Sequence, residues 1–320
     1  MGPGVHLFDR RVDNPIGVAA GPLPNSRWVE AYARLGYGLL TYNTVRSAAR
    51  AAYPAPNLVH CGDDDPAIAG PAPRPLDPAR LTWAVSFGLP SAEPDVWRAD
   101  VGRAKSKIGA GQLLIVSVVG TPAVGVEDEQ LADDYARCAR WAADAGADVI
   151  ELQLSGATAS DEPSQRVFEN PPLAAHVVDR VRRAVGPRPL IAKLGAARSP
   201  RALHELASRL APRLDGFTLV GGIVRPVVTR TGTPAFRAEN RLTGAVVGAG
   251  AHAHCQAQVE ELLAWRRAGA WSRVVLAVGG LTTVDRLHGA LAAGADAAMV
   301  ATAALADPLI CARFMQARRR

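Results

Sequence analysis

The sequence contains little lysine, little cysteine and few aromatic residues. Only three of its 36 basic residues are lysine, and aromatic residues make up 5% of the 320 residues. Its 4 cysteines lie far apart and include no Cys-x-x-Cys pair, which argues against a zinc site, an iron–sulfur cluster or a disulfide framework and favours a reducing cytoplasm. It has neither a signal peptide nor an apolar run long enough to span a bilayer. We therefore expect a cytoplasmic protein without a membrane part.

The charge does not indicate a nucleic-acid partner. The net charge is +6, but the arginines are scattered through helical patterns, unlike the basic stripes and aromatic stacking platforms of nucleic-acid-binding domains. We interpret the positive balance as a solvated surface that attracts anionic ligands. With 48% hydrophobic residues the chain can bury a large core, and we expect one domain spanning residues 1–320.

Short apolar runs alternate with helical patterns along almost the whole chain. The runs have the length of buried strands, and the segments between them carry apolar residues at three- and four-residue spacing. We expect eight strands, at residues 16–20, 39–42, 113–117, 148–154, 190–193, 216–220, 274–278 and 297–300. The helices expected between them include residues 26–35, 128–145, 173–185, 200–210, 256–268 and 283–293.

This alternation predicts an α/β fold, a closed (β/α)8 barrel of the TIM type. Strands that are apolar throughout are typical of a parallel sheet covered by helices, and eight such units close into a cylinder. A doubly wound open sheet is the alternative. It is disfavoured because no Gly-x-Gly-x-x-Gly turn follows the first strand and nothing would stop the sheet at eight strands.

Three segments fall outside the repeating unit. We expect residues 4–17 to form a small N-terminal hairpin that closes the bottom of the barrel. Residues 46–112 and 221–255 are long insertions after the second and sixth strands, which we expect to form lids or pocket walls. Three acids at residues 63–65 could ligate a cation, but a solvated turn fits them better because successive side chains in a turn diverge.

Lys193 is the residue that indicates most about function. It lies at the end of the apolar run 189–194, so a chain that uses arginine almost everywhere places a lysine where burying a charge is costly. A compact ammonium can donate to a narrow anionic or ring-nitrogen acceptor that a planar guanidinium would overfill. The alternative interpretation is a lysine that reaches solvent from a strand end.

The ends of the last two strands predict a phosphate site. Gly279 and Gly280 allow the backbone to approach a ligand with free N–H groups, and helices that begin near Thr283 and Ala304 direct their positive ends to the same place. Loops after the last two strands recurrently bind phosphate in barrels of this kind. A tight turn that needs glycine only for steric reasons is the alternative.

The ends of the first two strands fit a flat ring. Ala19, Ala20 and Gly21 are small enough for a ring to lie against the backbone, while Asn43 and Thr44 offer amide and hydroxyl groups to the edge of a heterocycle. Together with the phosphate site and the lysine of the fifth strand, these ends would surround a ligand of the size of FMN.

Six short segments, in order along the chain, carry a family resemblance. They are residues 14–21 (NPIGVAAG), 35–38 (LGYG), 86–90 (SFGLP), 147–152 (ADVIEL), 191–193 (IAK) and 278–281 (VGGL). In these segments the chain resembles the dihydroorotate dehydrogenase family, whose members are FMN-containing barrels. The similarity runs from about Val12 to Pro308, and so many collinear segments are more specific than any one of them.

The resemblance implies that FMN binds here, with Lys193 reaching the flavin ring system. Ala301 stands where the family usually has glycine, so its Cβ must be accommodated near the phosphate. Tyr42 replaces a lysine or a small residue beside the flavin. The residues that the resemblance assigns to FMN are Ala19, Ala20, Gly21, Asn43, Thr44, Lys193, Gly244, Gly279, Gly280, Ala301 and Thr302.

The substrate side departs from the family pattern. After the fourth strand the family has roughly Asn-x-Ser-(Cys or Ser)-Pro-Asn, whereas residues 153–158 of this chain read QLSGAT. Gly156 occupies the position of the catalytic base and has no side chain to take a proton. Val85 and Thr158 replace pyrimidine-binding asparagines, and residues 220–223 (VGGI) lack an expected asparagine as well. Because each unpaired polar group in a dry pocket costs about 1–3 kcal/mol, dihydroorotate is not the expected substrate.

Proton transfer without the usual base has three candidate sources. Ser155, Thr158 or Ser160 on the same loop could act as the base, although capping of the loop is the more ordinary role for such hydroxyls. Tyr42 could supply a proton from beside the flavin. Alternatively, the substrate could be acidic enough for solvent to suffice.

Two arginines and three histidines complete the candidates. Arg46 and Arg225 follow the second and sixth strands and could hold a substrate anion, although arginine is also the default surface residue here. His176, His204 and His288 fall in helix patterns away from the strand ends, so we interpret them as structural.

The residues and the resemblance together predict an FMN-dependent oxidoreductase acting on CH–CH groups. It would transfer a hydride between flavin N5 and a C–C single or double bond of a small, anionic, non-pyrimidine substrate. Two alternatives stay open, namely a genuine dihydroorotate dehydrogenase with a relocated base and a noncatalytic FMN-binding partner subunit. The expected partners are the substrate and an unidentified electron donor or acceptor, and analogy with the family adds a homodimer.

Overall fold

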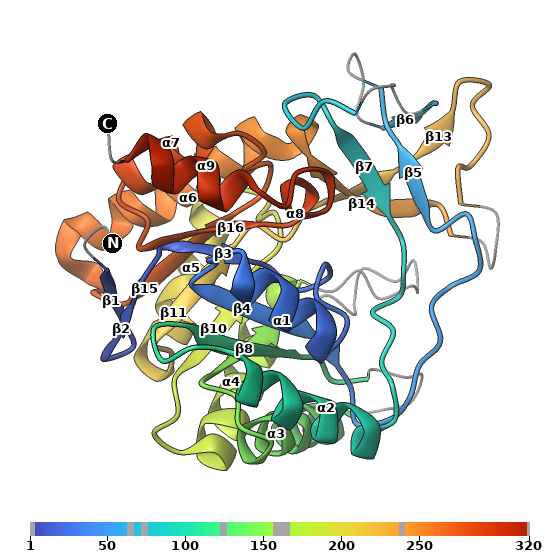
Figure 1. Ribbon diagram of the computed structural model, residues 1–320. Coiled ribbons are helices and arrows are strands. Elements are labelled where there is room, and N and C mark those ends of the chain that lie inside the picture. The colour runs from blue at the N-terminus through green and yellow to red at the C-terminus, as the bar shows by residue number, and fades with distance from the viewer. Residues whose placement is uncertain are drawn as a thin grey trace.

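The computed structural model describes residues 4–62, 67–71, 76–121, 127–155, 167–236 and 241–318. Eight parallel strands form a closed barrel, in the order β10-β11-β15-β16-β3-β4-β8-β9. Their bounds are β3 (Ile16–Val18), β4 (Leu39–Val45), β8 (Leu113–Val118), β9 (Val149–Gln153), β10 (Leu190–Lys193), β11 (Gly216–Leu219), β15 (Val274–Val278) and β16 (Ala297–Val300). The predicted (β/α)8 barrel and its eight strands are confirmed (Figure 1).

Helices surround the barrel and cover the outer face of its strands (Figure 1). They are α1 (Ser26–Arg34), α2 (Pro94–Lys107), α3 (Asp128–Asp144), α4 (Pro171–Val185), α5 (Pro200–Leu210), α6 (His252–Trp265), α7 (Val284–Ala292), α8 (Thr302–Ala306) and α9 (Ile310–Ala317). Short helical turns η2 (Val167–Glu169), η3 (Ala211–Arg213), η4 (Ala249–Ala251) and η5 (Arg266–Ala270) lie between them. The sequence did not predict α2, because that helix is embedded in the first long insertion.

Alternation along each strand separates two apolar cores. On β4, Leu39 packs inside the barrel, whereas Leu40 packs outward against the helices. On β8, Ile115 and Val116 divide in the same way. Since successive side chains of a strand point to opposite faces, the position of a residue in this alternation decides whether its side chain can reach a ligand at the barrel mouth.

The N-terminal hairpin closes the bottom of the barrel, as predicted. Strands β1 (Val5–Leu7) and β2 (Arg10–Val12) pair antiparallel. Their buried residues Leu7 and Val12 belong to the interior core, together with residues that begin barrel strands, such as Leu39 and Leu113. A ligand therefore has access to the opposite end, where the strands have their carboxyl termini.

Three aspartates fix the register of neighbouring strands at the bottom of the barrel. Asp148, Asp215 and Asp296 each precede a strand and accept a hydrogen bond from a backbone N–H of the neighbouring strand, at 2.9, 2.9 and 2.8 Å. Each aspartate also pairs with a basic side chain, from Lys105, Arg182 and Arg266 respectively. Fixed strand starts position the strand ends, where the candidate site lies.

The two long insertions form a joint structure that the sequence did not predict. The first contributes β5 (Leu58–His60), β6 (Ile68–Ala69) and β7 (Thr82–Val85), and the second contributes β12 (Ile223–Pro226), β13 (Val228–Thr229) and β14 (Thr243–Gly248). They pair into a four-stranded sheet, β12-β14-β7-β5, and a two-stranded sheet, β13-β6. The four-stranded sheet, which we call the insertion sheet, stands across from the carboxyl ends of the barrel strands (Figure 1).

A search of the described residues for a membrane-crossing helix found none of sufficient length and apolar character.

Candidate active site

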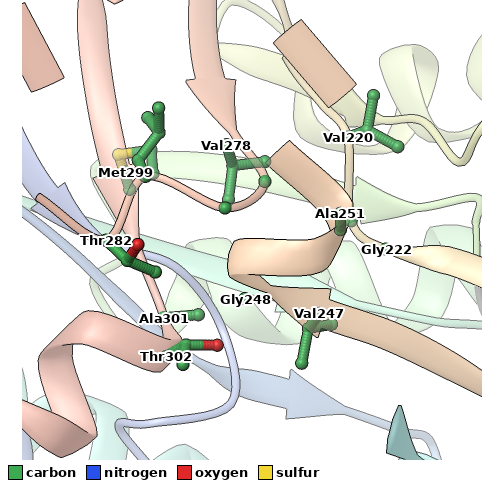
Figure 2. Close-up of a pocket in the computed structure, with 14 residues that line it drawn as sticks. Val220, Gly222, Val247, Gly248, Ala251, Val278, Thr282, Met299, Ala301 and Thr302 are labelled. Atoms are coloured by element: carbon green, nitrogen blue, oxygen red, sulfur yellow. The ribbon is translucent and has the colours of Figure 1, made fainter. Parts of the chain in front are cut away.

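A pocket lies at the carboxyl ends of the barrel strands, next to the insertion sheet (Figure 2). It encloses about 350 Å³ of unfilled space, part of it open to solvent. The lining residues come from the ends of β11, β15 and β16 and from the end of β14. They are Val220, Gly221, Gly222, Val247, Gly248, Ala251, Val278, Gly279, Gly280, Leu281, Thr282, Met299, Ala301 and Thr302.

Two glycines make the wall of this pocket from bare backbone. Gly279 and Gly280 have φ angles of 115° and 67°, in the left-handed region. A Cβ on Gly279 would lie 2.5 Å from the Cys255 sulfur, and one on Gly280 would lie 2.6 Å from the Cα of His252. The turn therefore requires glycine, and it leaves a concave wall in which backbone N–H groups can approach an anion.

Two basic side chains lie behind this turn. Arg286 donates to the carbonyl oxygen of Gly280 at 3.1 Å and to the hydroxyl of Thr282 at 2.7 Å, which holds the turn in shape. Burial lowers the pKa of Arg286. Burial, followed by the charge of Arg286, also lowers the pKa of His252. The wall is thus supported by one guanidinium and one imidazole that favours its neutral form.

A polar layer, formed by Glu151, Lys193 and Thr218, fills the barrel interior near the carboxyl ends of the strands, beside the pocket. Lys193 follows the inward-facing Ile191 by two residues and is 4% exposed. Its ammonium lies 3.9 Å from Oε1 of Glu151, which is 2% exposed, and it makes no hydrogen bond to another described residue. Oε1 of Glu151 and the hydroxyl of Thr218 are buried and have no hydrogen-bond partner among the described residues. Unpaired buried polar atoms are costly, so this layer has the character of a surface that a polar ligand completes.

Ser155 is the part of the predicted base loop that the structure describes. Its hydroxyl donates to Oε1 of Gln153 at 2.8 Å, and a Cβ on Gly221 would lie 3.0 Å from it. Ser155 therefore lies between the ends of β9, β10 and β11, close to the polar layer. Thr158, Ser160 and Gly156 lie outside the described residues.

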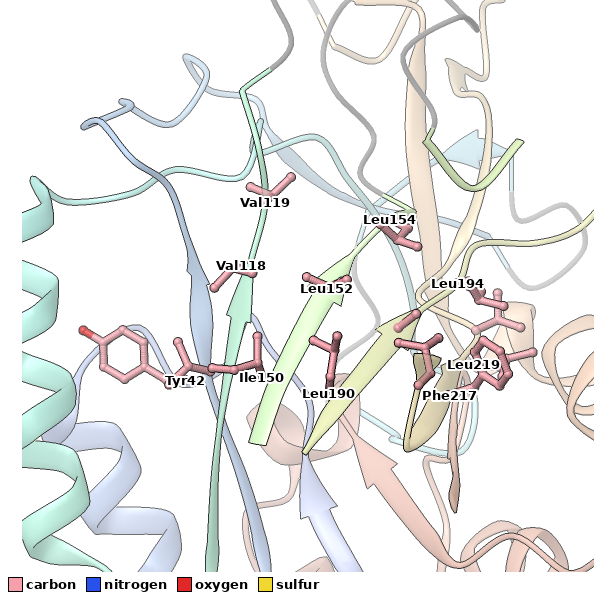
Figure 3. Close-up of a cluster of buried hydrophobic side chains, with 14 of the residues drawn as sticks. Tyr42, Val118, Val119, Ile150, Leu152, Leu154, Leu190, Leu194, Phe217 and Leu219 are labelled. Atoms are coloured by element: carbon pink, nitrogen blue, oxygen red, sulfur yellow. The ribbon is translucent and has the colours of Figure 1, made fainter. Parts of the chain in front are cut away.

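The structure corrects the prediction for Tyr42. Its side chain belongs to the outer core and points toward the helices (Figure 3). Its hydroxyl donates to Asp100 of α2 at 2.8 Å, and burial, followed by this hydrogen bond, raises its pKa. Burial alone would raise the pKa of Asp100, but hydrogen bonds from Ser26, Tyr42 and Arg103 outweigh it and lower that pKa. Tyr42 cannot supply a proton at the barrel mouth because strand alternation directs it outward.

The remaining residues predicted for the cofactor lie around the barrel mouth, with one exception. Gly279, Gly280, Ala301 and Thr302 line the pocket. Gly244, on β14, does not line it, because it packs against Phe236. Gly248, four residues further along β14, does line it. The sequence offered a signal for Gly248 in the pair Gly248 and Gly250, which immediately precedes a helix.

The ends of the first two strands are small and polar, as expected. The N–H of Ala19 donates to the Val300 carbonyl oxygen, which joins the first and last strands. Ala20 follows, half-buried, and a Cβ on Gly21 would meet nothing within 4 Å. On β4, Asn43 is half-buried and Thr44 is buried.

Of the other polar candidates, Arg46 and the three helix histidines have structural partners. Arg46 is buried and donates to the carbonyl oxygens of Leu89 and Gly120, and burial, followed by the charge of Arg50, lowers its pKa to about 10. Arg225 is half-buried on β12. The three helix histidines also have partners. His176 contacts Glu129, His204 contacts Glu261, and His288 packs against Phe314.

The described residues offer no metal site. Among the described residues no cluster of three or more His, Cys, Asp or Glu side chains could hold a metal ion. The acids at residues 63–65 lie outside the described residues.

The insertion sheet presents an apolar face toward the pocket. Val85 pairs with Ala245, and Ala245 pairs with Val224, so these three side chains lie on the same face. Val247, two residues after Ala245, lines the pocket, and a Cβ on Gly222 would touch both Val247 and Ala245. This face is therefore aliphatic where Ala245 and Val247 approach the pocket, and Trp83 and His60 continue it further along the sheet.

Comparisons with known proteins agree with the motifs. No protein-family model matches the sequence. A dihydroorotate dehydrogenase of Dictyostelium discoideum is 28% identical, and the match covers 97% of this chain and 86% of the relative. A dihydroorotate dehydrogenase (quinone) of Thermus thermophilus is 26% identical, with 93% and 77% covered. A solved structure of DHODH from Eimeria tenella in complex with ferulenol has a TM-score of 0.74 at 16% identity and covers 98% of this chain and 82% of that one, a likeness of fold.

Proposed function

We propose, from the similarity of this chain to dihydroorotate dehydrogenases over nearly its full length, that it is an FMN-dependent oxidoreductase acting on CH–CH groups. We propose that residues 1–320 form one barrel domain, since the two insertions pair with each other at the barrel mouth. The observation that carries it is the position of Lys193, a nearly buried ammonium with free donors at the carboxyl end of β10.

The described residues fit FMN. The glycine turn at Gly279 and Gly280 forms a cradle that any Cβ would fill, which suits a phosphate approached by backbone N–H groups. The unpaired oxygens of Glu151 and Thr218 and the donors of Lys193 suit the polar edge of a flavin ring. We assign the phosphate to the pocket of Figure 2, with Ala301 and Thr302 at its edge, and the ring to the polar layer. Ala19, Ala20, Gly21, Asn43 and Thr44 would border the ring on the other side.

FMN, when bound, supplies a hydride donor and acceptor to the reaction. The chain would contribute orientation and electrostatics. Lys193 would place a positive charge next to the ring, and the glycine turn would hold the phosphate. The apolar residues of the insertion sheet next to the pocket would exclude water from the substrate. Ser155, whose hydroxyl already donates to Gln153, is the described side chain best placed to carry a proton.

We propose that the substrate is small, conjugated and anionic, and is not a pyrimidine. A pyrimidinedione ring needs several polar partners, and Val85, Ala245 and Val247 offer none. Each unpaired ring polar group would cost about 1–3 kcal/mol in such a pocket. A genuine dihydroorotate dehydrogenase with a relocated base is the second candidate, favoured by the similarity to proteins that are themselves named dihydroorotate dehydrogenases.

Anaerobic reduction of the FMN-loaded protein tests the proposal. We expect dihydroorotate to bleach the flavin at most slowly, and an anionic enoate such as fumarate or cinnamate to reoxidise flavin reduced with dithionite faster than buffer does. Rapid bleaching by dihydroorotate would establish the second candidate instead. A flavin that exchanges electrons with none of these compounds would favour a noncatalytic FMN-binding subunit.

The Lys193→Ala variant tests the assignment of that residue. It removes the ammonium next to the ring, so we expect FMN to bind at least tenfold more weakly or to be reduced more slowly. Unchanged flavin content and unchanged kinetics would remove Lys193 from the site. Lys105→Ala is the matched control, because Lys105 binds Asp148 at the bottom of the barrel.

A further inference from the structure

Glu151 and Lys193 form a charged pair inside the barrel, in which the two side chains are close but not hydrogen-bonded. Glu151 lies on β9 and Lys193 on β10, and the register of these neighbouring strands sets Lys193 opposite Gln153, two residues beyond Glu151. Both side chains point inward, and 2% and 4% of these residues are exposed. At 3.9 Å, the carboxylate oxygen and the ammonium attract each other without a direct hydrogen bond.

Burial makes this pair energetically significant. An isolated ammonium in an apolar interior is costly, and a nearby carboxylate offsets much of that cost. Among the described residues the other buried charged side chains are Arg46, Asp100 and Arg241, which contact α2, the insertions or loops rather than the barrel interior. Glu151 is therefore the counter-charge on which Lys193 depends.

The polar neighbours of the pair do not replace that counter-charge. The groups around it are Ser117 on β8, level with Glu151, Gln153 on β9, and Thr218 on β11, level with Lys193. All three are uncharged. Within the described part of the chain, neither the buried hydroxyl of Thr218 nor Oε1 of Glu151 makes a hydrogen bond.

We propose that Glu151 is a positioning residue, which offsets the cost of burying the Lys193 ammonium and holds it in place while leaving its N–H groups available to the flavin ring. A carboxylate in direct hydrogen-bond contact would occupy one or two of the three donors, whereas one at 3.9 Å attracts the ammonium and occupies none. The inference rests on the proposed FMN site, since it assigns the free donors to the ring of that cofactor.

A double-mutant cycle on FMN affinity tests this role. The variants are Glu151→Gln, Lys193→Met and the double variant, with the dissociation constant measured by quenching of FMN fluorescence. We expect Lys193→Met to weaken binding at least tenfold and Glu151→Gln to weaken it several-fold. In the Lys193→Met background, Glu151→Gln should cost nothing, because no ammonium remains to be positioned. Equal effects of Glu151→Gln in both backgrounds would overturn the proposal.

Rescue by a conservative variant gives a second readout that separates the charge from packing. Glu151→Asp keeps the carboxylate, whereas Glu151→Gln keeps the length of the side chain and removes its charge, so we expect Glu151→Asp to bind FMN more tightly than Glu151→Gln. A role in packing alone predicts the opposite order, because only Glu151→Asp shortens the side chain. Weaker FMN binding by Glu151→Asp than by Glu151→Gln contradicts the inference. Failure of wild type itself to bind FMN would instead refute the proposed function.

Discussion

Tyr42 and Lys193 both lie near the carboxyl ends of barrel strands, but on opposite faces of the barrel wall. Lys193 belongs to the polar layer inside the barrel, whereas Tyr42 lies in the outer core and bonds to Asp100. A position near a strand end does not by itself make a residue part of the site. Side chains along a strand point alternately into and out of the barrel, so a shift of one residue reverses the direction of the side chain.

Replacement of Tyr42 by Phe separates the structural role from a catalytic one. The change removes one hydrogen bond to a charged partner, so we expect the free energy of unfolding to fall by about 1–3 kcal/mol. FMN affinity and the rate of flavin reduction should stay within twofold of wild type. Denaturant unfolding and stopped-flow reduction measure the two quantities. A large loss of rate at unchanged stability would restore Tyr42 as a proton donor.

His252 makes stability depend on pH through its buried ring. Burial and the charge of Arg286 lower its pKa in the folded state below the value of about 6.5 expected for the unfolded chain. The unfolded state therefore binds more protons as the pH falls below 6.5, and stability is lost as the pH falls through the folded-state value. Without FMN, we expect Tm to fall less between pH 7.5 and 5.5 in His252→Gln than in wild type. Equal falls would exclude His252 as a source of the pH dependence.

Some site residues could be predicted from the sequence because their residue type alone carries the signal. Lys193 is a rare lysine after an apolar run, and Gly279 and Gly280 form a pair that follows a strand, so both are visible without coordinates. Glu151 gave no such signal, since one acid within an apolar strand does not show which strand neighbour it faces. The Tyr42 interpretation failed because the sequence does not show that its ring points outward.

The turn after β15 is the element on which the phosphate assignment depends. Gly280→Ala would add a Cβ that lies 2.6 Å from the Cα of His252, so the turn must move. We expect FMN affinity to fall at least tenfold, measured by fluorescence quenching. Gly186→Ala is the matched control, since Gly186 has a φ of 59° but a Cβ there would meet nothing within 4 Å. The control should lose about 1–3 kcal/mol of stability through backbone strain and keep its FMN affinity. Equal FMN affinity in both variants would move the phosphate elsewhere.

The barrel elements were more predictable than the insertions for a physical reason. Each barrel strand is buried on both faces and reads as a continuous apolar run, and each helix on it keeps a regular apolar spacing. The insertion strands β7 and β14 are short and pair across more than 150 residues of sequence, so no local pattern indicates their partnership. Helix α2 was missed because it shares an insertion with these strands.

Pairing of the insertions gives the whole molecule one functional end. The hairpin of β1 and β2 closes the bottom of the barrel, while the insertion sheet stands at the top, beside the pocket and the polar layer (Figure 1). The site is thus bounded by the polar layer with Lys193 and Glu151, by the turn at Gly279 and Gly280, and by the apolar side chains of the insertion sheet. This arrangement suits a flavin whose ring lies on the polar layer, with a conjugated substrate between the ring and the insertion sheet.

Titration of the purified, flavin-free protein with FMN is the most direct test of this arrangement. We expect saturable quenching of FMN fluorescence with one FMN per chain and a shifted visible flavin spectrum, both weakened at least tenfold in Lys193→Ala. A protein that stays colourless and leaves FMN fluorescence unchanged at high concentration would contradict the flavin site and the oxidoreductase function built on it.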